Sequence, residues 1–462
     1  MAHQAEVTED QYVFKPETRK KLYILLAVGI ALLFLGLILD MNSGGQEEHG
    51  GGHAATISNE LVASADQHDA ASGGQEAEMH HAETATWLKK LYTTLWMHNV
   101  FFTGLGIIGL FFVAIQFAAQ AGWSVGVKRV ALAMGAWIPI AGLLMLGLWF
   151  LTSHDIFHWT HSSLYEEMLP DGSTNPSFDK IIADKSPFFF WPLAGGSFPL
   201  FYLFRMVLFF GVWFWFLTQI RKNMLAEDVD PSTSYWHKNQ VLSTVFLIFF
   251  GLSSSVAAWD WVMSIDTHWF STMVGWYVFA SWWVTGLAAI TLIVAYLKDA
   301  GYLKIVNANH MHDLGKFIFA FSIFWTYIWF SQFLLIYYAN IPEESVYFVE
   351  RMGSSPYSWI FYLNIILNFA LPLLLLMTRD AKRQLSTLKL VCPIIIIGHW
   401  FDFFNMVTPG VMHHDGGVGF MEIGVGLIFL AAFLLVVLNS LSKMPLFGKN
   451  DPMLQESLHH HI

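Results

Sequence analysis

The hydrophobic residues of this chain gather in ten long runs, and polar residues gather between them. Each run is close in length to the ~20 residues with which a helix crosses a bilayer. The runs lie at residues 22–39, 95–121, 130–151, 199–218, 241–265, 272–297, 317–339, 357–377, 390–407 and 420–438. This pattern predicts an all-α, polytopic membrane protein with about ten transmembrane helices.

Composition favours the same class and excludes others. Of the 462 residues, 55% are hydrophobic and only 13% are charged, whereas soluble domains carry about 25% charged residues. The net charge of −11 and the dispersed basic residues do not fit nucleic-acid binding. The single cysteine, Cys392, excludes an internal disulfide, a four-cysteine iron–sulfur site and haem attachment through a Cys-x-x-Cys-His motif.

The basic residues between the runs predict how the chain crosses the membrane. If the spans alternate in direction, one side carries most lysines and arginines, from Lys15 before the first run to Lys449 after the last. The opposite side has only Lys89, Lys90, Lys180, Lys185 and Arg351. Because basic residues favour the cytoplasmic side, both termini are expected in the cytoplasm. No cleavable signal precedes the first run, so we expect this span to be retained.

A weak internal repeat relates the fifth and ninth runs. The segment Trp-Asp-Trp-Val-Met at 259–263 is similar to Trp-Phe-Asp-Phe-Phe-Asn-Met at 400–406, and Trp-Phe recurs at 149–150 and 329–330. The repeat predicts two four-helix bundles, spans two to five and six to nine, related by an axis along the membrane normal. The predicted units are 1–39 (cytoplasmic N-terminus and first span), 40–94 (low-complexity outer loop), 95–265 (first bundle), 266–408 (second bundle) and 409–462 (last span and cytoplasmic tail).

Two long connections are expected on the outer face. The first is rich in Gly, Ala, Glu and His, and its histidines are His49, His53, His68, His80 and His81. Their spacing fixes no ligand geometry, so a low-complexity segment that covers a partner is favoured over a metal site. The second connection, 152–198, contains the aromatic run 188–191 and is predicted to be a surface cap or docking element.

Several ionisable side chains fall inside the runs, where burial in hydrocarbon is costly and therefore indicates function. Asp260 lies in the fifth span between two tryptophans, and Arg205 lies in the fourth. An arginine at that depth needs a partner, for which Asp260 and Asp402 are the candidates. A plain ion pair that holds the bundle together remains the alternative for Arg205, and interfacial polarity remains the alternative for Asp260.

His399 and Asp402 form the second candidate group, in the ninth span. They are three residues apart, so in a helix their side chains share a face. An imidazole beside a carboxylate can accept and release protons near neutral pH. The pair therefore predicts a proton relay or a hydrogen bond to a quinone carbonyl. A structural hydrogen bond between helices is the alternative.

A third group follows the third span and contains His154, Asp155, His158 and His161 at helical spacing. Three interpretations remain open for it: a metal site, a proton exit at the outer surface, and ordinary interfacial polarity. No matching ligand set occurs elsewhere, so no metal is predicted. No span carries the paired, well-separated histidines of a dihaem cytochrome b, so haem is not predicted either.

These segments together resemble a known family. Ten spans, cytoplasmic termini and a doubled four-helix unit are similar to the polysulfide-reductase-type, or NrfD-like, membrane subunits. The segments WDWVMSIDTHWFSTM at 259–273 and GHWFD at 398–402, with the His-rich outer loop, look most like the second, shorter NrfD-like subunit of bacterial alternative complex III.

The resemblance implies a place in a respiratory quinol:cytochrome c oxidoreductase of the bacterial inner membrane. It implies partners that carry the redox centres: a sister NrfD-like subunit, multihaem and monohaem cytochrome c subunits with haem c, and an iron–sulfur subunit with its clusters. The substrate would be menaquinol or another quinol. The residues carried over are His399, Asp402 and Asp260, with His154–Asp155 as an outer path. A structural scaffold subunit and a secondary transporter are the alternative functions.

Overall fold

Ten helices cross the molecule in the computed structural model, which describes residues 10–43, 84–353 and 356–461. These described parts contain no β-strand, so the all-α prediction with ten spans is confirmed. The spans are α1 (Pro16–Ser43), α3 (Thr86–Ala118), α4 with α5 (Val125–Met134 and Ile138–Ile156), α8 (Leu200–Val229), α9 (Ser234–Trp261), α10 (Val274–Asp299), α11 (Ala308–Ala339), α13 with α14 (Ser358–Ile365 and Leu371–Leu375), α16 (Leu385–Val407) and α18 (Phe420–Leu441).

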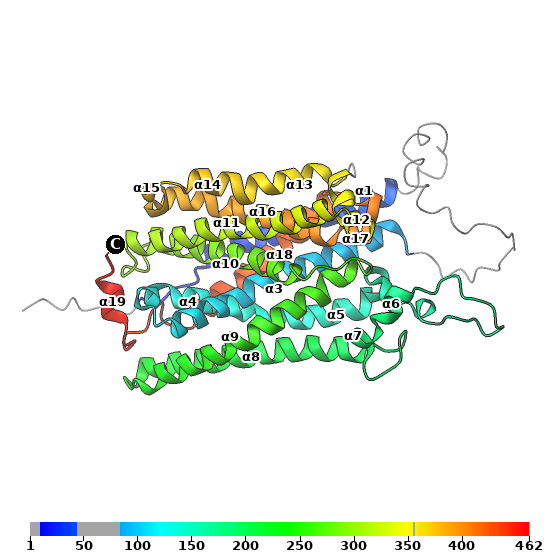
Figure 1. The fold of residues 1–462 in the computed structure, drawn as a ribbon. Coiled ribbons are helices and arrows are strands. Elements are labelled where there is room, and N and C mark those ends of the chain that lie inside the picture. The colour runs from blue at the N-terminus through cyan, green and yellow to red at the C-terminus, as the bar shows by residue number, and fades with distance from the viewer. Residues whose placement is uncertain (1–9, 44–83, 354–355, 462) are drawn as a thin grey trace, which may run out of the picture.

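The helices run roughly side by side, and the short elements gather at the two ends of the bundle (Figure 1). One end, here the cap end, carries α6 (Lys180–Asp184), α7 (Ser186–Phe190), α12 (Pro342–Gly353) and α17 (Pro409–Met412). The other, here the tail end, carries α15 (Arg379–Arg383) and α19 (Leu454–Leu458).

Several helices are longer than the apolar runs that predicted them. α3 begins at Thr86 instead of residue 95, α8 continues to Val229 instead of 218, and α11 begins at Ala308 instead of 317. The added turns are polar, such as the Asn-His-Met-His-Asp segment that opens α11. Hydropathy marks the part of a helix that hydrocarbon surrounds, whereas the helix itself ends where its caps are, as at Asn307 before α11.

Spans two to five contact one another in a ring. α3 packs on α5, α5 on α8, α8 on α9, and α9 again on α3. Spans six to nine repeat this ring, because α10 packs on α11, α11 on α14, α13 on α16, and α16 on α10. In each set, the helix that carries the candidate carboxylate, α9 or α16, packs against the first helix of the set.

The two rings meet where α3 crosses α10. Gly104 lies against the Trp282 ring, Gly286 lies against Ile108, and a Cβ atom at either glycine would overlap its neighbour. Both glycines occupy the middle of a Thr-Gly-Leu sequence, at 103–105 and at 285–287. Small residues of this kind let two membrane helices approach closely. Thr-Gly-Leu is thus a third repeated segment, besides those at 259–263 with 400–406 and at 149–150 with 329–330.

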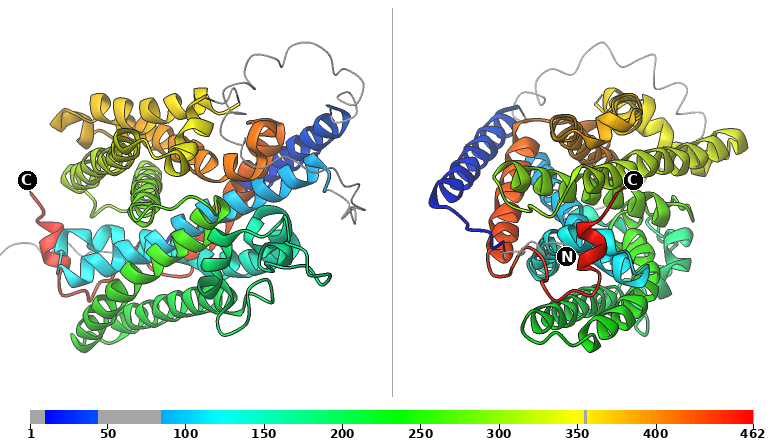
Figure 2. Two further views of the ribbon diagram at one scale, coloured as in Figure 1. Left: turned by 45° about the vertical axis from the view of Figure 1, so that its right-hand side comes forward. Right: turned by 90° about the vertical axis from the view of Figure 1, so that its left-hand side faces the viewer.

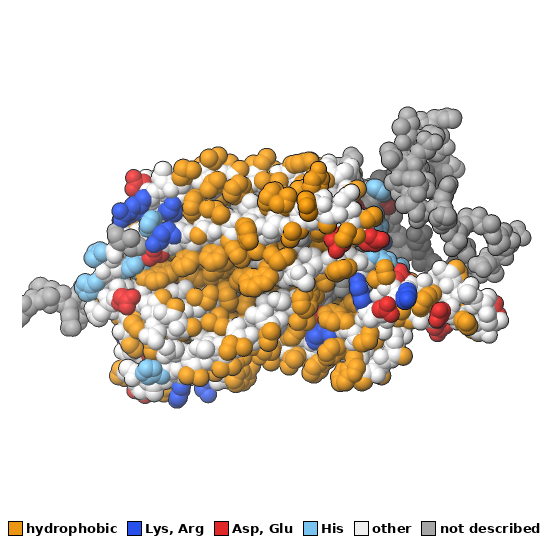
Figure 3. Space-filling model, viewed as in Figure 1, with side chains coloured by type: hydrophobic (Ala, Val, Ile, Leu, Met, Phe, Trp, Pro, Cys, Tyr) orange, Lys and Arg blue, Asp and Glu red, His pale blue; other side chains and the backbone are white. Residues whose placement is uncertain are grey.

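The first span lies at the periphery, alongside α18 (Figure 2). Gly29 and Gly36 of α1 face the α18 backbone closely enough that a side chain would not fit. Much of the remaining surface of α1 is apolar and exposed. Hydrophobic side chains also cover most of the molecule's flank, and charged side chains gather toward the two ends (Figure 3). This is the surface that a bilayer requires.

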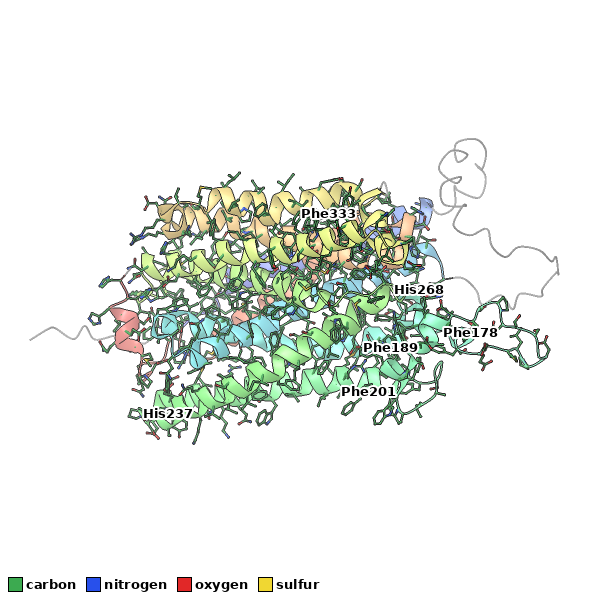
Figure 4. All side chains as sticks on the ribbon, in the orientation of Figure 1. Phe178, Phe189, Phe201, His237, His268 and Phe333 are labelled. Carbon is green, nitrogen blue, oxygen red and sulfur yellow. The ribbon has the colours of Figure 1, made fainter. Side chains whose placement is uncertain are left out.

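The cap between α5 and α8 is folded onto the first ring. Phe189, near the middle of the aromatic run, stacks on Trp159 with ring centroids 4.0 Å apart, and both rings are buried. Phe189 and His268 are labelled toward the cap end in Figure 4. His268 bonds to Asp179 at 2.5 Å. The aromatic run thus anchors the cap, while Trp191 alone of its four residues is largely exposed. The histidines of 40–94 that the sequence singled out, His49 to His81, lie outside the described residues.

Candidate functional site

The side chain of Asp402 lies at the centre of a buried polar cluster inside the second ring. Asp402 and His399, both on α16, have no exposed surface. α10 contributes Tyr277 and Ser281, and α11 contributes Trp325. Asn364 comes from α13. Every helix of the second ring therefore contributes a side chain to this cluster.

Both carboxylate oxygens of Asp402 accept hydrogen bonds from uncharged donors. Oδ1 accepts from the Tyr277 hydroxyl and from Asn364 Nδ2, the latter at 2.7 Å. Oδ2 accepts from Ser281 Oγ at 2.6 Å and from Trp325 Nε1 at 3.0 Å. Four aligned donors stabilise a buried carboxylate without a cation. The site is therefore built around a carboxylate that only neutral donors contact at these distances.

The His399 imidazole stands next to this carboxylate. Its Nδ1 lies 3.4 Å from Asp402 Oδ2, and its ring packs edge-on against Trp325. Its Nε2 is buried and has no hydrogen-bond partner among the described residues. A neutral imidazole that donates from Nδ1 keeps a lone pair on Nε2. Nε2 is thus a ring nitrogen of this cluster that no described residue engages.

A change in helix geometry shapes the tail-end side of the cluster. Residues Ile366–Ala370 form a π-helical turn between α13 and α14, and Asn368 in that turn donates to the Asn364 amide oxygen. The Asn368 side chain lies against Gly398, where a Cβ atom would overlap it. π-helical turns inside membrane helices often mark functional sites. Here the turn places the Asn368 amide next to Asn364, so that Asn364 links Asn368 to Asp402.

The first ring holds its carboxylate differently. Arg205 on α8 binds Asp260 through two hydrogen bonds, Nε to Oδ2 at 2.8 Å and Nη2 to Oδ1 at 2.6 Å. The guanidinium also donates to the Phe188 carbonyl and lies over the Phe188 and Phe201 rings. Of the two candidates that the sequence offered for Arg205, Asp260 is its partner. The pair joins α8, α9 and the cap.

The histidines after the third span lie at the cap end, although not on one helix. α5 ends at Ile156 because Phe157 is extended, so the helical spacing expected through His161 is wrong. The rings still gather, since the His154 and His161 centroids are 3.9 Å apart. Together with Asp155 and His158 they line a cavity of about 670 Å³. No set of three metal-ligating groups occurs in the described part of the chain.

A second set of charged residues connects this cavity with the interior of the second ring. His413 lines the cavity, and its Nδ1 bonds to Glu350 at 2.8 Å. Glu350 lies 3.7 Å from Arg351, whose Nη2 donates to Asp266 at 2.9 Å. Burial raises the pKa of Asp266, and the neighbouring Arg351 offsets part of that rise.

A small cavity lies between Asp266 and Asp402. Tyr277, Tyr347, Met406 and Asp266 line it, and its volume is about 10 Å³, roughly the space of a single water molecule. Tyr277 therefore touches Asp402 on one side and this cavity on the other. The other residues that line the cavity, among them Val262 and Val274, are apolar, so a proton path from Asp402 to Asp266 would need a water molecule in it.

Sequence reasoning missed several members of this arrangement. Tyr277 and Trp325 are hard to find because aromatic residues are abundant in every span. Arg351 could have been found from the sequence, since it is one of few basic residues on the predicted outer side. Asp266, which follows the end of α9, is the carboxylate that pairs with Arg351. His98, also fully buried, is not part of the cluster, because its two ring nitrogens bond to Thr94 and Trp400.

No protein-family model matches this chain, and no curated protein sequence matches it either.

Proposed function

We propose that this chain is a membrane subunit of a respiratory quinol:cytochrome c oxidoreductase, of the NrfD-like kind found in alternative complex III, and that it transfers protons. Electrons would pass through haem c and iron–sulfur clusters of partner subunits, because this chain offers no ligand set for either. The bacterial inner membrane, with both termini in the cytoplasm, is the expected location. The observation that supports proton transfer best is the Asp402 cluster.

Within the cluster, His399 and Asp402 form the relay. A proton that arrives at His399 Nε2 is balanced by movement of the Nδ1 proton toward Asp402 Oδ2, 3.4 Å away. Asp402 then shares a hydrogen bond with Tyr277, which borders the small cavity beside Asp266. From there the carboxylates Asp266 and Glu350, which Arg351 holds by ion pairs, lead to His413 and the cap-end cavity. The His154–Asp155–His158 group would release protons from that cavity.

The size of the small cavity favours proton transfer over quinol binding at Asp402. About 10 Å³ accommodates a water molecule and excludes a quinone ring. The four donors on Asp402 are also already used within the protein. A menaquinol ring would have to displace Tyr277 or Trp325 to reach this carboxylate. The proposal therefore assigns proton handling to this site.

The experiment compares two variants that each remove one hydrogen bond from Asp402. Tyr277→Phe also removes the hydroxyl that faces the small cavity, whereas Ser281→Ala leaves that cavity unchanged. In the purified complex reconstituted into vesicles, we expect Y277F to lower proton release per electron at least about tenfold, within the range known for lost proton-transfer groups. S281A should change it by less than about twofold.

Asp402→Asn provides the second arm. It removes the titratable group and should abolish the proton release that depends on this chain, while electron transfer through the partner subunits continues at a lower rate. Equal proton release in the parent, D402N and Y277F would leave a scaffold role for the chain. Copurification without any cytochrome, together with uptake of a solute, would support the transporter instead.

A further inference from the structure

A second buried charge cluster lies at the tail end and is not part of the proposed function. It contains Lys128 and Arg129 at the start of the third span, and Glu227 and Asp228 at the end of α8. Asp451, from the chain's C-terminal segment, completes it. Lys128, Arg129 and Glu227 are each at most 3% exposed. Such burial of five charged residues requires nearly complete pairing.

Two ion pairs account for four of these five residues. Arg129 binds Asp228 through Nη1 and Nη2 at 2.8 and 2.6 Å. Lys128 Nζ lies 2.6 Å from Asp451 Oδ2, and both side chains are 4% exposed. The fifth residue, Glu227, belongs to neither ion pair. Its Oε1 is buried and has no hydrogen-bond partner among the described residues.

The charge balance of the cluster therefore requires a proton. Two cations face three carboxyl groups, and the charged side chains that act on Glu227 are Asp451, Lys128, Arg129 and Asp228. An additional buried negative charge without a partner is far more costly than a neutral carboxylic acid. Glu227 is the carboxyl group that neither cation engages, so it is the one that binds the proton.

The residue that completes the cluster belongs to the segment that follows the last membrane helix. Residues 445–461, here the C-terminal strap, run across the tail end (Figure 2). Asn450 bonds to the Glu227 and Asp228 carbonyls, and Ser457 bonds to Trp123. Near its end, His460 accepts from Asn307 and Asn309 and pairs with Asp313. The strap thereby bridges the first ring and the second.

We propose that Glu227 is a second proton-binding site, whose proton is held while the strap is closed and is released when Asp451 leaves Lys128. On opening, the O–H bond of Glu227 breaks, the proton passes to water, and the carboxylate takes the place of Asp451 beside Lys128. The cluster remains neutral in both states: two cations with Asp228 and Asp451, or two cations with Asp228 and Glu227. Alkaline pH therefore favours the open strap, with one proton released per opening.

The experiment measures strap opening through a new thiol. Ser457 is fully buried in the closed strap, and the only native cysteine, Cys392, is buried in α16 and gives little background. The rate at which a maleimide labels Ser457→Cys in the solubilised full-length protein is divided by its rate with a free thiol at the same pH, because thiolate formation alone accelerates labelling. This ratio should rise with pH, by up to about tenfold per pH unit for one released proton. Adding Glu227→Gln, which keeps the shape and has no titratable proton, should remove the pH dependence of the ratio.

Two control variants separate the alternatives. Glu456→Gln changes an exposed carboxyl group of the strap and should preserve the pH dependence. His460→Gln removes a further titratable contact of the strap, with Asp313 and beside His310. His310 Nε2 also contacts Ser457 Oγ at 3.1 Å, and every variant in the comparison carries Ser457→Cys, so this contact is changed equally in all of them. A pH dependence that survives E227Q and disappears in H460Q would overturn the proposal. So would an infrared spectrum in which E227Q removes no protonated-carboxyl band.

This test is independent of the Asp402 site. Proton release during turnover reports the function proposed for Asp402, whereas strap labelling is measured without substrate. A failure of one therefore leaves the other unaffected.

Discussion

Each ring contains a buried carboxylate at a corresponding position, but the two carboxylates have different hydrogen-bond partners. Asp260 directly follows Trp259, and Asp402 lies two residues after Trp400, each near the cap end of the last helix of its ring. Asp260 is neutralised by two hydrogen bonds from Arg205, a fixed positive charge. Asp402 is surrounded by Tyr277, Ser281, Trp325 and Asn364, which are all uncharged.

This difference separates an ion pair from a carboxylate that neutral donors hold. Losing the charge of Asp260 would leave the Arg205 guanidinium buried without its partner. Losing the charge of Asp402 would leave no cation unpaired. The first ring thus gains a connection to its cap, and the second ring contains the carboxylate to which the proposed function assigns proton transfer.

The largest expected effect is on folding, and it tests the comparison directly. Asp260→Asn leaves Arg205 buried without its counter-charge, which typically costs about 3–5 kcal/mol. Asp402→Asn loses hydrogen bonds to neutral donors only, at about 1–3 kcal/mol. The melting temperatures of the two solubilised variants should therefore differ, with D260N the lower. Equal melting temperatures would contradict the distinction between the rings.

The two buried histidines offer a second, smaller test. Both ring nitrogens of His98 are bonded, whereas His399 has an unpartnered Nε2. His98→Gln should lower stability by about 1–3 kcal/mol, because Trp400 Nε1 loses its acceptor, and should leave proton release unchanged. His399→Gln should lower proton release about tenfold with a smaller change in melting temperature. Reversed results would remove His399 from the relay.

The smallest effect concerns the cap-end cavity that His158 and His161 line. Burial lowers the pKa of His158, with His268 adding to the effect, and burial together with His154 lowers the pKa of His161. The folded cap therefore binds fewer protons than the unfolded cap, and its stability falls as pH drops below 6.5, the ordinary histidine pKa.

Hydrogen exchange of residues 157–199 should detect this loss. The protection factors, which compare the observed exchange with the intrinsic rate at the same pH, should fall by less than about tenfold between pH 7 and pH 5. A variant with both His158→Gln and His161→Gln should lose that fall. Protection factors that rise on acidification would contradict the expected direction.

Part of the site could be read from the chain itself. The three-residue spacing of His399 and Asp402 places them on one helix face whatever surrounds them. Arg205 needed a carboxylate partner at its depth, and the sequence offered only two candidates. The helical spacing after His154 was misleading, because a single extended residue, Phe157, ends the helix. Periodicity cannot reveal such a break when both flanks are equally polar.

Other parts depend on contacts that no local pattern contains. Nothing in the sequence around Tyr277 or Trp325 distinguishes them from the many other aromatic residues, and they matter because α10 and α11 direct them at Asp402. The same holds for Glu227. It lacks a cationic partner because Lys128 pairs with Asp451, which is distant in the sequence.

The sequence by itself determined the ten membrane helices, because the hydrophobic effect acts on each apolar run separately and needs no neighbour. It also determined which few charges hydrocarbon would enclose. The tertiary structure decided which of those charges pair with a cation and which are held by neutral donors. That outcome depends on the electrostatic environment of each buried carboxyl group, and side chains from several helices supply this environment only once they are packed together.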